Sequence, residues 1–283
     1  MAIDLLRQTR DYFKAQGIPE VDASILLEHI LQCSRSEVQL KLMKLSGDEL
    51  AEVDRILRRY VLRRQTGEPV QYITGQAPFR YLEYKVGPGV LIPRPETESL
   101  VGLALEHLKS MEQTNKRGDE IRVVDLGSGS GCVAISIATE FKAATVTAVE
   151  NSPEALKWLQ TNVAELAPAI RIVSADVSSA CKGEKFDLVV TNPPYIPGGT
   201  SLPLEVRREP AEALFGGGAD GAKAPAAFIA AATRLLNSGG FLAIEHDQTQ
   251  SDLIRELLAS DYLEINSYND LTGRPRFTTA VRR

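Results

Sequence analysis

The chain has 283 residues, enough for one large domain and a smaller one, and its apolar and charged fractions are those of an ordinary globular protein. Its net charge of −5 gives no general attraction to nucleic acid, and no apolar run is long enough to cross a membrane, so neither partner is expected. Three scattered cysteines match neither a disulfide framework nor a metal site, which favours the cytoplasm.

Residues 1–66 are expected to form a small helical domain, because apolar residues recur at helical spacing and no strand pattern interrupts them. Ser-x-x-Glu capping boxes begin at Ser34 and Ser46. The second box opens a helix with an apolar inner face. Its outer face is predicted to carry five arginines, which are Arg55, Arg58, Arg59, Arg63 and Arg64. Because charge runs are usually solvated, we interpret this face as solvent-exposed rather than as a docking site.

Residues 67–94 are expected to form a hairpin and a linker. Short extended pieces replace the helical pattern here, and the alternation in residues 79–86 predicts a β-hairpin. The two prolines that flank Arg94 predict a stiff connector before a helix over residues 96–108. From composition alone, this stretch is a linker that packs domains together.

Residues 95–283 alternate between strand and helix patterns, which is typical of an α/β domain with a doubly wound parallel sheet. Strands are expected over residues 121–126, 145–149, 170–174, 186–191, 241–245, 263–268 and 277–281. Residues 237–240 are expected to be a turn, and helices connect most of the strands. Ligands bind such sheets at the carboxyl ends of the strands.

Polar groups and glycines follow four of these strands in chain order. They are the loop Gly127, Ser128, Gly129, Ser130 and Gly131, then Glu150, then Asp176 with Val177, and then Asn192. Glycines let the backbone approach a ligand, and Glu150 lies where this fold places a carboxylate for a ribose. Taken singly, Glu150 is equally well a solvated strand end, Asp176 a turn former, and Asp125 an acceptor that fixes the loop.

The glycine loop departs from the G-x-G-x-x-G pattern of nicotinamide-dependent dehydrogenases. The four strand ends together resemble S-adenosylmethionine-dependent methyltransferases. That resemblance implies a Rossmann-like sheet of seven strands, with the last strand antiparallel.

The fourth strand ends in Asn192, Pro193, Pro194 and Tyr195. Two prolines end the strand and leave carbonyls free, beside an amide that both donates and accepts. An amide nitrogen is a poor nucleophile because its lone pair is delocalised. We expect the Asn192 oxygen and the Pro193 carbonyl to accept both hydrogens of a substrate NH2 group, with Tyr195 packed against it and no general base needed before transfer. The alternative is a rigid Asn-Pro turn.

With these residues in view, the chain resembles the bacterial protein-(glutamine-N5) methyltransferases of the PrmC/HemK family, which modify peptide chain release factors. The resemblance runs nearly end to end and is most specific at residues 91–98, Leu-Ile-Pro-Arg-Pro-Glu-Thr-Glu. It implies that S-adenosylmethionine is bound by residues 127–131, Glu150, Asp176, Val177 and Asn192.

The resemblance also implies a substrate. This is the glutamine of the Gly-Gly-Gln motif in release factors, bound by residues 192–195, while the helical domain grips the factor. A cytoplasmic monomer is expected. One departure is Val177, which stands where the family usually has an aromatic residue that stacks on adenine.

Two other functions stay open at this point. A methyltransferase acting on DNA adenine or on an RNA amine would present an exocyclic amine to the same tetrapeptide, although the chain has no basic insert for gripping phosphates. A cofactor-binding module without catalysis is the other alternative, and the intact residues 192–195 argue against it.

Overall fold

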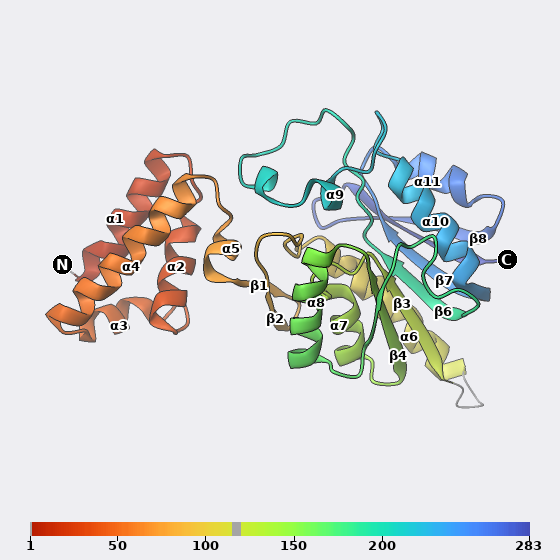
Figure 1. Cartoon of the computed structure of the whole chain (residues 1–283), viewed down its shortest axis with the longest axis horizontal. Coiled ribbons are helices and arrows are strands. Elements are labelled where there is room, and N and C mark those ends of the chain that lie inside the picture. The colour runs from red at the N-terminus through yellow and green to blue at the C-terminus, as the bar shows by residue number, and fades with distance from the viewer. Residues whose placement is uncertain (1, 115–119) are drawn as a thin grey trace. The chain divides into compact units, whose positions relative to one another are not determined.

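The computed structural model describes residues 2–114 and 120–283, with side chains for residues 5–113 and 120–283 (Figure 1). The chain forms two compact units. One contains the residues up to Gln76 together with Pro203–Arg208, and the other contains Ala77–Leu202 and Glu209–Arg283. The predicted domain boundaries after residues 66 and 94 stay predictions. Met1, the first residue of the predicted helical domain, lies outside the described residues.

The first unit is helical, as predicted (Figure 1). It contains α1 (Ala2–Ala15), α2 (Val21–Leu31), α3 (Val38–Lys44), α4 (Gly47–Gln65), α5 (Val70–Thr74) and the 3₁₀ turn η1 (Val206–Arg208). Apolar side chains from several of these helices form its core, including Phe13, Leu26, Leu27, Leu42 and Leu57. Burial of this shared apolar surface is what makes such short helices stable in water.

One of the two predicted capping boxes is present. Ser46 accepts the backbone N–H of Glu49, and the Glu49 carboxylate accepts the Ser46 N–H at 2.8 Å, so both halves of the box cap α4. The prediction that Ser34 caps a helix is wrong. The Glu37 carboxylate accepts the Ser34 N–H at 2.9 Å, but α3 begins only at Val38.

The sequence pattern predicts an extended stretch before the hairpin, but part of this stretch is helical. Pro69 starts the short helix α5, in which Val70, Tyr72 and Ile73 are buried. A helix of five residues is too short to show a helical period in sequence, and its burial is what stabilises it. The predicted hairpin is confirmed and consists of β1 (Gln76–Phe79) and β2 (Leu82–Lys85).

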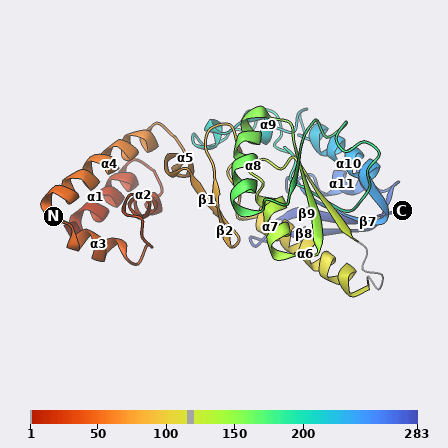
Figure 2. The same cartoon turned by 60° about the horizontal axis from the view of Figure 1, so that its bottom comes forward.

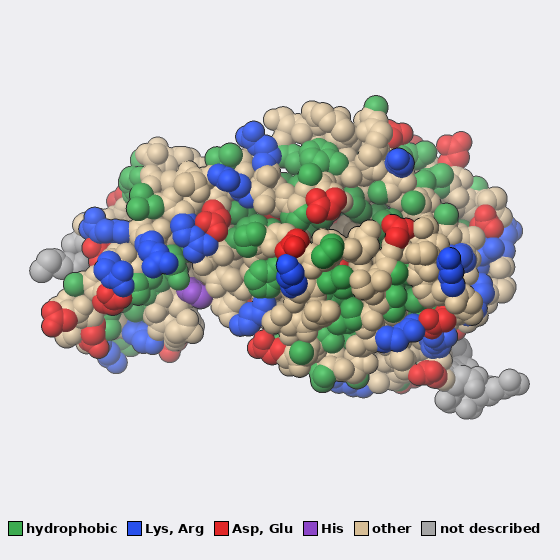
Figure 3. Space-filling view, in the orientation of Figure 1, with side chains coloured by type: hydrophobic (Ala, Val, Ile, Leu, Met, Phe, Trp, Pro, Cys, Tyr) green, Lys and Arg blue, Asp and Glu red, His purple; other side chains and the backbone are tan. Residues whose placement is uncertain are grey.

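The arginine face of α4 is only partly solvated. Arg55 and Arg58 are exposed, and Figure 3 shows Lys and Arg side chains gathered over this unit with acidic ones among them. The prediction is wrong for Arg64, whose side chain is 5% exposed. Arg64 Nε donates to Asp22 at 2.7 Å, and its Nη2 donates to Glu205. A buried guanidinium therefore joins two helices to a segment far along the chain.

The segment Pro203–Arg208 packs on the C-terminal end of α4. Leu204 lies against Gly67, where a Cβ would come within 2.4 Å of the leucine Cγ, and Gly67 has a φ of 83°. Arg208 donates to the carbonyl of Thr66 at 2.6 Å. No side chain larger than hydrogen fits at Gly67 without displacing this segment.

The second unit is built on a mixed sheet (Figures 1 and 2). Within residues 120–283 the strand order is β5-β4-β3-β6-β7-β9-β8. The strands are β3 (Ile121–Leu126), β4 (Ala144–Glu150), β5 (Arg171–Ser174), β6 (Phe186–Thr191), β7 (Leu236–Glu245), β8 (Tyr262–Asn269) and β9 (Pro275–Arg282). The first five pair in parallel, and β9 runs antiparallel to both of its neighbours. The predicted seven-stranded sheet with an antiparallel last strand is confirmed.

Helices cover both faces of this sheet. One face carries α6 (Thr97–Thr114), α7 (Cys132–Glu140) and α8 (Pro153–Leu166), and the other carries α10 (Lys223–Leu235) and α11 (Ser251–Leu258) (Figure 2). The short helix α9 (Ala211–Leu214) lies in the connection after β6. The order in which the strands are added to the sheet switches sides at β3, because β4 and β5 lie on one side of it and β6 lies on the other. A crevice for ligands is expected at such a switch point.

Strand β7 is longer than predicted. The expected turn at residues 237–240 is a bulge inside the strand, opposite Asp187, and pairing resumes at Phe241. Gly239 takes up the left-handed conformation there, with φ 79°, and Asn237 Nδ2 donates to the Asp187 carboxylate at 2.9 Å. Polar and glycine residues thus mark the bulge, which resembles a turn in sequence.

Candidate active site

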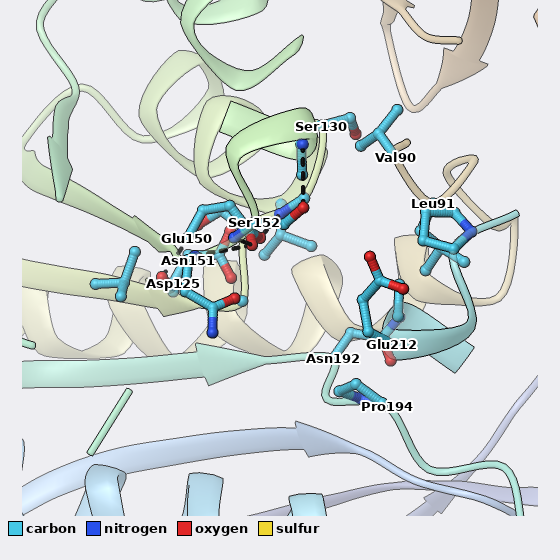
Figure 4. Close-up of a pocket in the computed structure, with 18 of the residues that line it drawn as sticks. Val90, Leu91, Asp125, Ser130, Glu150, Asn151, Ser152, Asn192, Pro194 and Glu212 are labelled. Atoms are coloured by element: carbon cyan, nitrogen blue, oxygen red, sulfur yellow. Dashed lines mark hydrogen bonds between the residues drawn. The ribbon is translucent and has the colours of Figure 1, made fainter. Parts of the chain in front are cut away.

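A cavity of about 290 Å³ opens at the carboxyl ends of β3, β4, β5 and β6, near the lower end of the range for ligand pockets (Figure 4). Nine of the residues predicted from sequence line it: Gly127, Ser128, Gly129, Ser130, Glu150, Asp176, Val177, Asn192 and Pro194. Gly131, Pro193 and Tyr195 do not. The structure therefore brings the four predicted strand ends to one place.

The glycine loop has the left-handed backbone that its sequence suggests, with φ of 73° at Gly127, 55° at Gly129 and 85° at Gly131. Gly131 acts in packing rather than in lining the cavity. A Cβ there would come within 2.7 Å of Leu159 and 3.0 Å of Ile135, so glycine is needed where α7 begins beside α8.

Glu150 is held rigidly at the end of β4. Its Oε1 accepts the N–H groups of Asn151 and Ser152 at 2.9 and 2.8 Å, and its Oε2 accepts the Gly129 N–H at 2.8 Å (Figure 4). Glu150 is only 8% exposed, so the alternative of a solvated strand end is wrong. Each carboxylate oxygen has two lone pairs, so Oε2 keeps capacity for one more donor.

Asp125 supports the loop from beneath. Its carboxylate accepts the N–H of Ala134 at 3.2 Å, in the first turn of α7, and Ser128 donates to its backbone carbonyl at 3.1 Å. It fixes the loop through the helix start rather than through the glycine amides. Burial raises the pKa of the Asp125 carboxyl to about 7, because desolvation outweighs these hydrogen bonds.

The third strand end combines a turn with an apolar wall. Asp176 accepts the Ser178 N–H at 2.9 Å, and hydrogen bonds from Ser178 hold the pKa of the Asp176 carboxyl below its ordinary value. It is therefore a turn former that also lines the cavity. Val177 and Phe228 add apolar surface to the lining, a surface suited to the flat face of a base.

Asn192 has a defined amide orientation. Its Nδ2 donates to Thr97 Oγ1 at 3.2 Å, and the residue lines the cavity beside Pro194. Tyr195 is outside the cavity lining, and its packing against a substrate stays a prediction. Its hydroxyl donates to Glu245 Oε1 at 2.9 Å, and burial raises the pKa of the tyrosine well above its ordinary value.

Sequence reasoning missed one wall of the site. Gly89, Val90, Leu91, Pro93 and Arg94 line the cavity, and Figure 4 shows Val90 and Leu91 across from Glu150. Composition alone predicts only a linker for this stretch. Its unusual Leu-Ile-Pro-Arg-Pro-Glu-Thr-Glu string was the available signal, since a plain linker needs no such pattern.

Arg94 links the segment Gly89–Arg94 to the connection after β6 by an ion pair. Its guanidinium donates to Glu209 Oε1 at 2.6 Å, while the Ile92 N–H donates to the other carboxylate oxygen at 3.0 Å. Glu209 is followed by Pro210 and Glu212, which also line the cavity. Glu212 is missing from the sequence prediction as well, although the family resemblance extends to Pro210 and Ala213 on either side of it.

The site fits the predicted cofactor in three respects. A glycine-rich loop, a fixed carboxylate with spare acceptor capacity and an apolar wall surround one cavity at the switch point of the sheet. The fold and the site define an S-adenosylmethionine-dependent methyltransferase. No helix of the described residues is both long and apolar enough to cross a membrane.

Comparisons with known proteins narrow this class. Residues 103–219 match the family model "Methyltransferase small domain", and residues 4–75 match "PrmC N-terminal domain". The chain is 39% identical to release factor glutamine methyltransferase of Bifidobacterium longum, covering 98% of each chain. It is 33% identical to that of Escherichia coli, covering 96% of each. The chain belongs to the family of release factor glutamine methyltransferases.

Solved structures support the fold alone. A methyltransferase from Pyrococcus furiosus is 18% identical, with a TM-score of 0.51 over 84% of this chain and 98% of its own. The 16S rRNA N2 G1207 methyltransferase of T. thermophilus is 21% identical, with a TM-score of 0.51 over 74% of this chain and 50% of its own.

Proposed function

We propose that this methyltransferase acts on the side-chain amide nitrogen of the glutamine in the Gly-Gly-Gln motif of peptide chain release factors. The observation that carries the proposal is the orientation of the Asn192 amide, which lines the cavity. Its Nδ2 donates a hydrogen bond to Thr97 Oγ1 at 3.2 Å. This leaves its oxygen to accept from a substrate. The names of the full-length relatives, which specify a release factor glutamine, support the same substrate.

S-adenosylmethionine supplies a methyl group on a positively charged sulfur. When bound, the cofactor would give this methyl group to the amide nitrogen and keep the electron pair of the broken carbon–sulfur bond, and the nitrogen would lose one proton to water. Asn192 Oδ1, which lines the cavity, would accept one N–H group of the substrate. The Pro193 carbonyl would accept the other, although Pro193 itself lies between the lining residues Asn192 and Pro194. That contact draws the lone pair out of the amide plane and aims it, so catalysis depends on positioning and electrostatics.

The roles of the individual residues are part of the proposal. Glu150 would accept from the ribose of the cofactor, residues 127–131 would contact the cofactor through their backbone, and Asp176 with Val177 would lie beside the adenine. Asn192 contacts the cofactor as well as the glutamine. Tyr195 supports the motif through its hydroxyl rather than by lining the cavity.

Glu150→Ala is expected to weaken S-adenosylmethionine binding about 10- to 100-fold, because a charge-assisted hydrogen bond contributes about 1.5–3 kcal/mol. Loss of its bonds to the glycine loop adds to the effect. Calorimetric titration with the cofactor measures it. The matched control is Glu165→Ala, an exposed glutamate on α8 outside the cavity. Equal affinity in the two variants would show that Glu150 does not hold the cofactor.

The helical unit grips the release factor in this proposal, which its match to the PrmC N-terminal domain supports. The enzyme acts as a monomer in the cytoplasm, without a stable nucleic-acid partner. The three free thiols support the cytoplasmic location, and the net charge of −5 supports the lack of a nucleic-acid partner.

The deciding experiment measures methyl transfer from labelled S-adenosylmethionine. The acceptors are a purified release factor, the same factor with the Gly-Gly-Gln glutamine changed to alanine, duplex DNA and ribosomal RNA. Label is expected on the first acceptor alone. Label on DNA or RNA, with none on the release factor, would favour the exocyclic-amine alternative. No label on any acceptor, with the cofactor bound, would favour a binding module.

A further inference from the structure

A chain of hydrogen bonds leads from Asn192 into the protein interior. Asn192 Nδ2 donates to Thr97 Oγ1 at 3.2 Å, and the Thr97 hydroxyl donates to Glu245 Oε2 at 2.8 Å. Thr97 and Glu245 are 2% and 1% exposed. Thr97 is the first residue of α6, and Glu245 is the last residue of β7. The hydrogen bond between them therefore joins two elements through residues that are 148 positions apart in the sequence.

The direction of these bonds follows from the chemistry of the groups. An ionised carboxylate has no proton to give, so the single hydroxyl proton of Thr97 goes to Glu245. The Thr97 oxygen is then left only as an acceptor. Asn192 must present its NH2 group to it, and the amide oxygen therefore faces the opposite way.

Glu245 also holds the far end of the same motif. Its second oxygen accepts the Tyr195 hydroxyl at 2.9 Å, and Arg276 donates to that hydroxyl at 3.3 Å. The backbone carbonyl of Tyr195 accepts from Gln250 at 2.9 Å. A single buried carboxylate thus fixes the first and the last side chain of the Asn-Pro-Pro-Tyr motif.

We infer that Thr97 and Glu245 are positioning residues, which hold the Asn192 amide with its oxygen toward the substrate NH2 group. This inference rests on the proposed function. If Thr97 gave its proton to Asn192 instead, the amide would turn and present a second NH2 group to a substrate that itself has only N–H groups. The accepting contact on which the methyl transfer depends would then be lost.

The protonation state of Glu245 controls this arrangement. Burial raises the pKa of the Glu245 carboxyl to about 7, and Glu96, before α6, acts in the same direction, while Arg276 on β9 opposes it. Tyr195 and Cys132, the other titratable groups that face Glu245, have pKa values raised above their ordinary range by burial. Glu245 therefore takes up a proton as the pH falls through about 7, and it then becomes a donor.

Thr97→Val tests the inference, because it removes the hydroxyl and keeps the shape of the side chain. We expect kcat for release factor methylation at pH 8 to fall about tenfold, the effect of one lost hydrogen bond in the transition state. The affinity for S-adenosylmethionine should stay within about threefold of the wild-type value. Thr97→Ser, which restores the hydroxyl, should recover most of kcat.

The pH profile separates positioning from a merely structural role. Wild-type kcat is expected to fall below about pH 7 as Glu245 becomes protonated. Thr97→Val breaks the link, so its kcat should lack this step. The matched control is Thr139→Val, which removes a hydroxyl that donates to carbonyls of its own helix, Ile135 and Ser136. It should keep the wild-type rate and profile.

The outcomes distinguish the inference from the proposed function. Wild-type kcat and pH profile in Thr97→Val would overturn the inference alone. Absence of methyl transfer by the wild-type protein would overturn both. If circular dichroism shows that Thr97→Val is misfolded, Glu245→Gln decides the question. Low kcat without the step near pH 7 supports the inference in that variant, and a wild-type profile overturns it.

Discussion

Asn192→Ala is expected to lower kcat for release factor methylation by about 10²–10³, the effect of removing one preorganised hydrogen-bonding group from an active site. The alanine has no oxygen to accept from the substrate amide, so the nitrogen lone pair stays delocalised and unaimed. The fold should be preserved, because the lost side chain lines a cavity and its hydrogen bond within the described part of the protein is to Thr97. Steady-state transfer of labelled methyl groups measures the change.

The control for this variant is Asn266→Ala, which removes an exposed asparagine on β8 that donates to the Glu264 carbonyl. Cofactor binding should be unchanged in Asn266→Ala and largely retained in Asn192→Ala, which loses one of several proposed cofactor contacts, and it is measured by calorimetry. Wild-type turnover by Asn192→Ala would contradict the mechanism. A loss of cofactor binding equal to the loss of kcat would instead place Asn192 in the cofactor site alone.

Arg64→Ala is expected to destabilise the helical unit by about 3–5 kcal/mol, because it leaves a buried carboxylate without its partner. Asp22, which accepts from Arg64 at 2.7 Å, is 4% exposed. Burial already raises the pKa of the Asp22 carboxyl even with Arg64 beside it. Since the chain has two units and unfolding need not be two-state, hydrogen exchange of the amides of α2 and α4 is the suitable measurement.

Arg58→Ala is the matched control for the buried arginine. It breaks an ion pair with Asp54 on the same helix, but the Arg58 side chain is 77% exposed, so the expected cost is about 0–1 kcal/mol. A double variant, Asp22→Ala with Arg64→Met, should recover much of the stability by removing both charges. Equal exchange rates in Arg64→Ala and Arg58→Ala would show that the buried pair does not stabilise the unit.

Much of the fold could be predicted because its signals are local. Strand, glycine loop and helix follow one another at residues 121–140, and Glu150 and Asn192 each come directly after an apolar run. Parallel strands bring their carboxyl ends to one edge of a sheet, so a group at each end is enough to predict a common site. Glu150, Asp176 and Asn192 line one cavity, and their roles in binding stay predictions.

Other features could not be predicted because their partners are remote in sequence. The arginines of α4 look alike in the sequence, yet Arg64 is buried while Arg58 is not. Arg64 differs because its guanidinium binds Asp22 on α2 and also Glu205, which lies 141 residues further along. Helical spacing says which face a residue is on, but it contains no information on what covers that face.

The sequence by itself therefore determined the class of sheet, the loop and carboxylate at its edge, and the amide at the end of β6, because each is set by neighbours along the chain. Only the tertiary structure decided that Arg94 joins Glu209 across 115 residues and that Thr97 joins Glu245 across 148. The physical reason is that buried polar groups must find partners, and folding alone determines which partners come within reach.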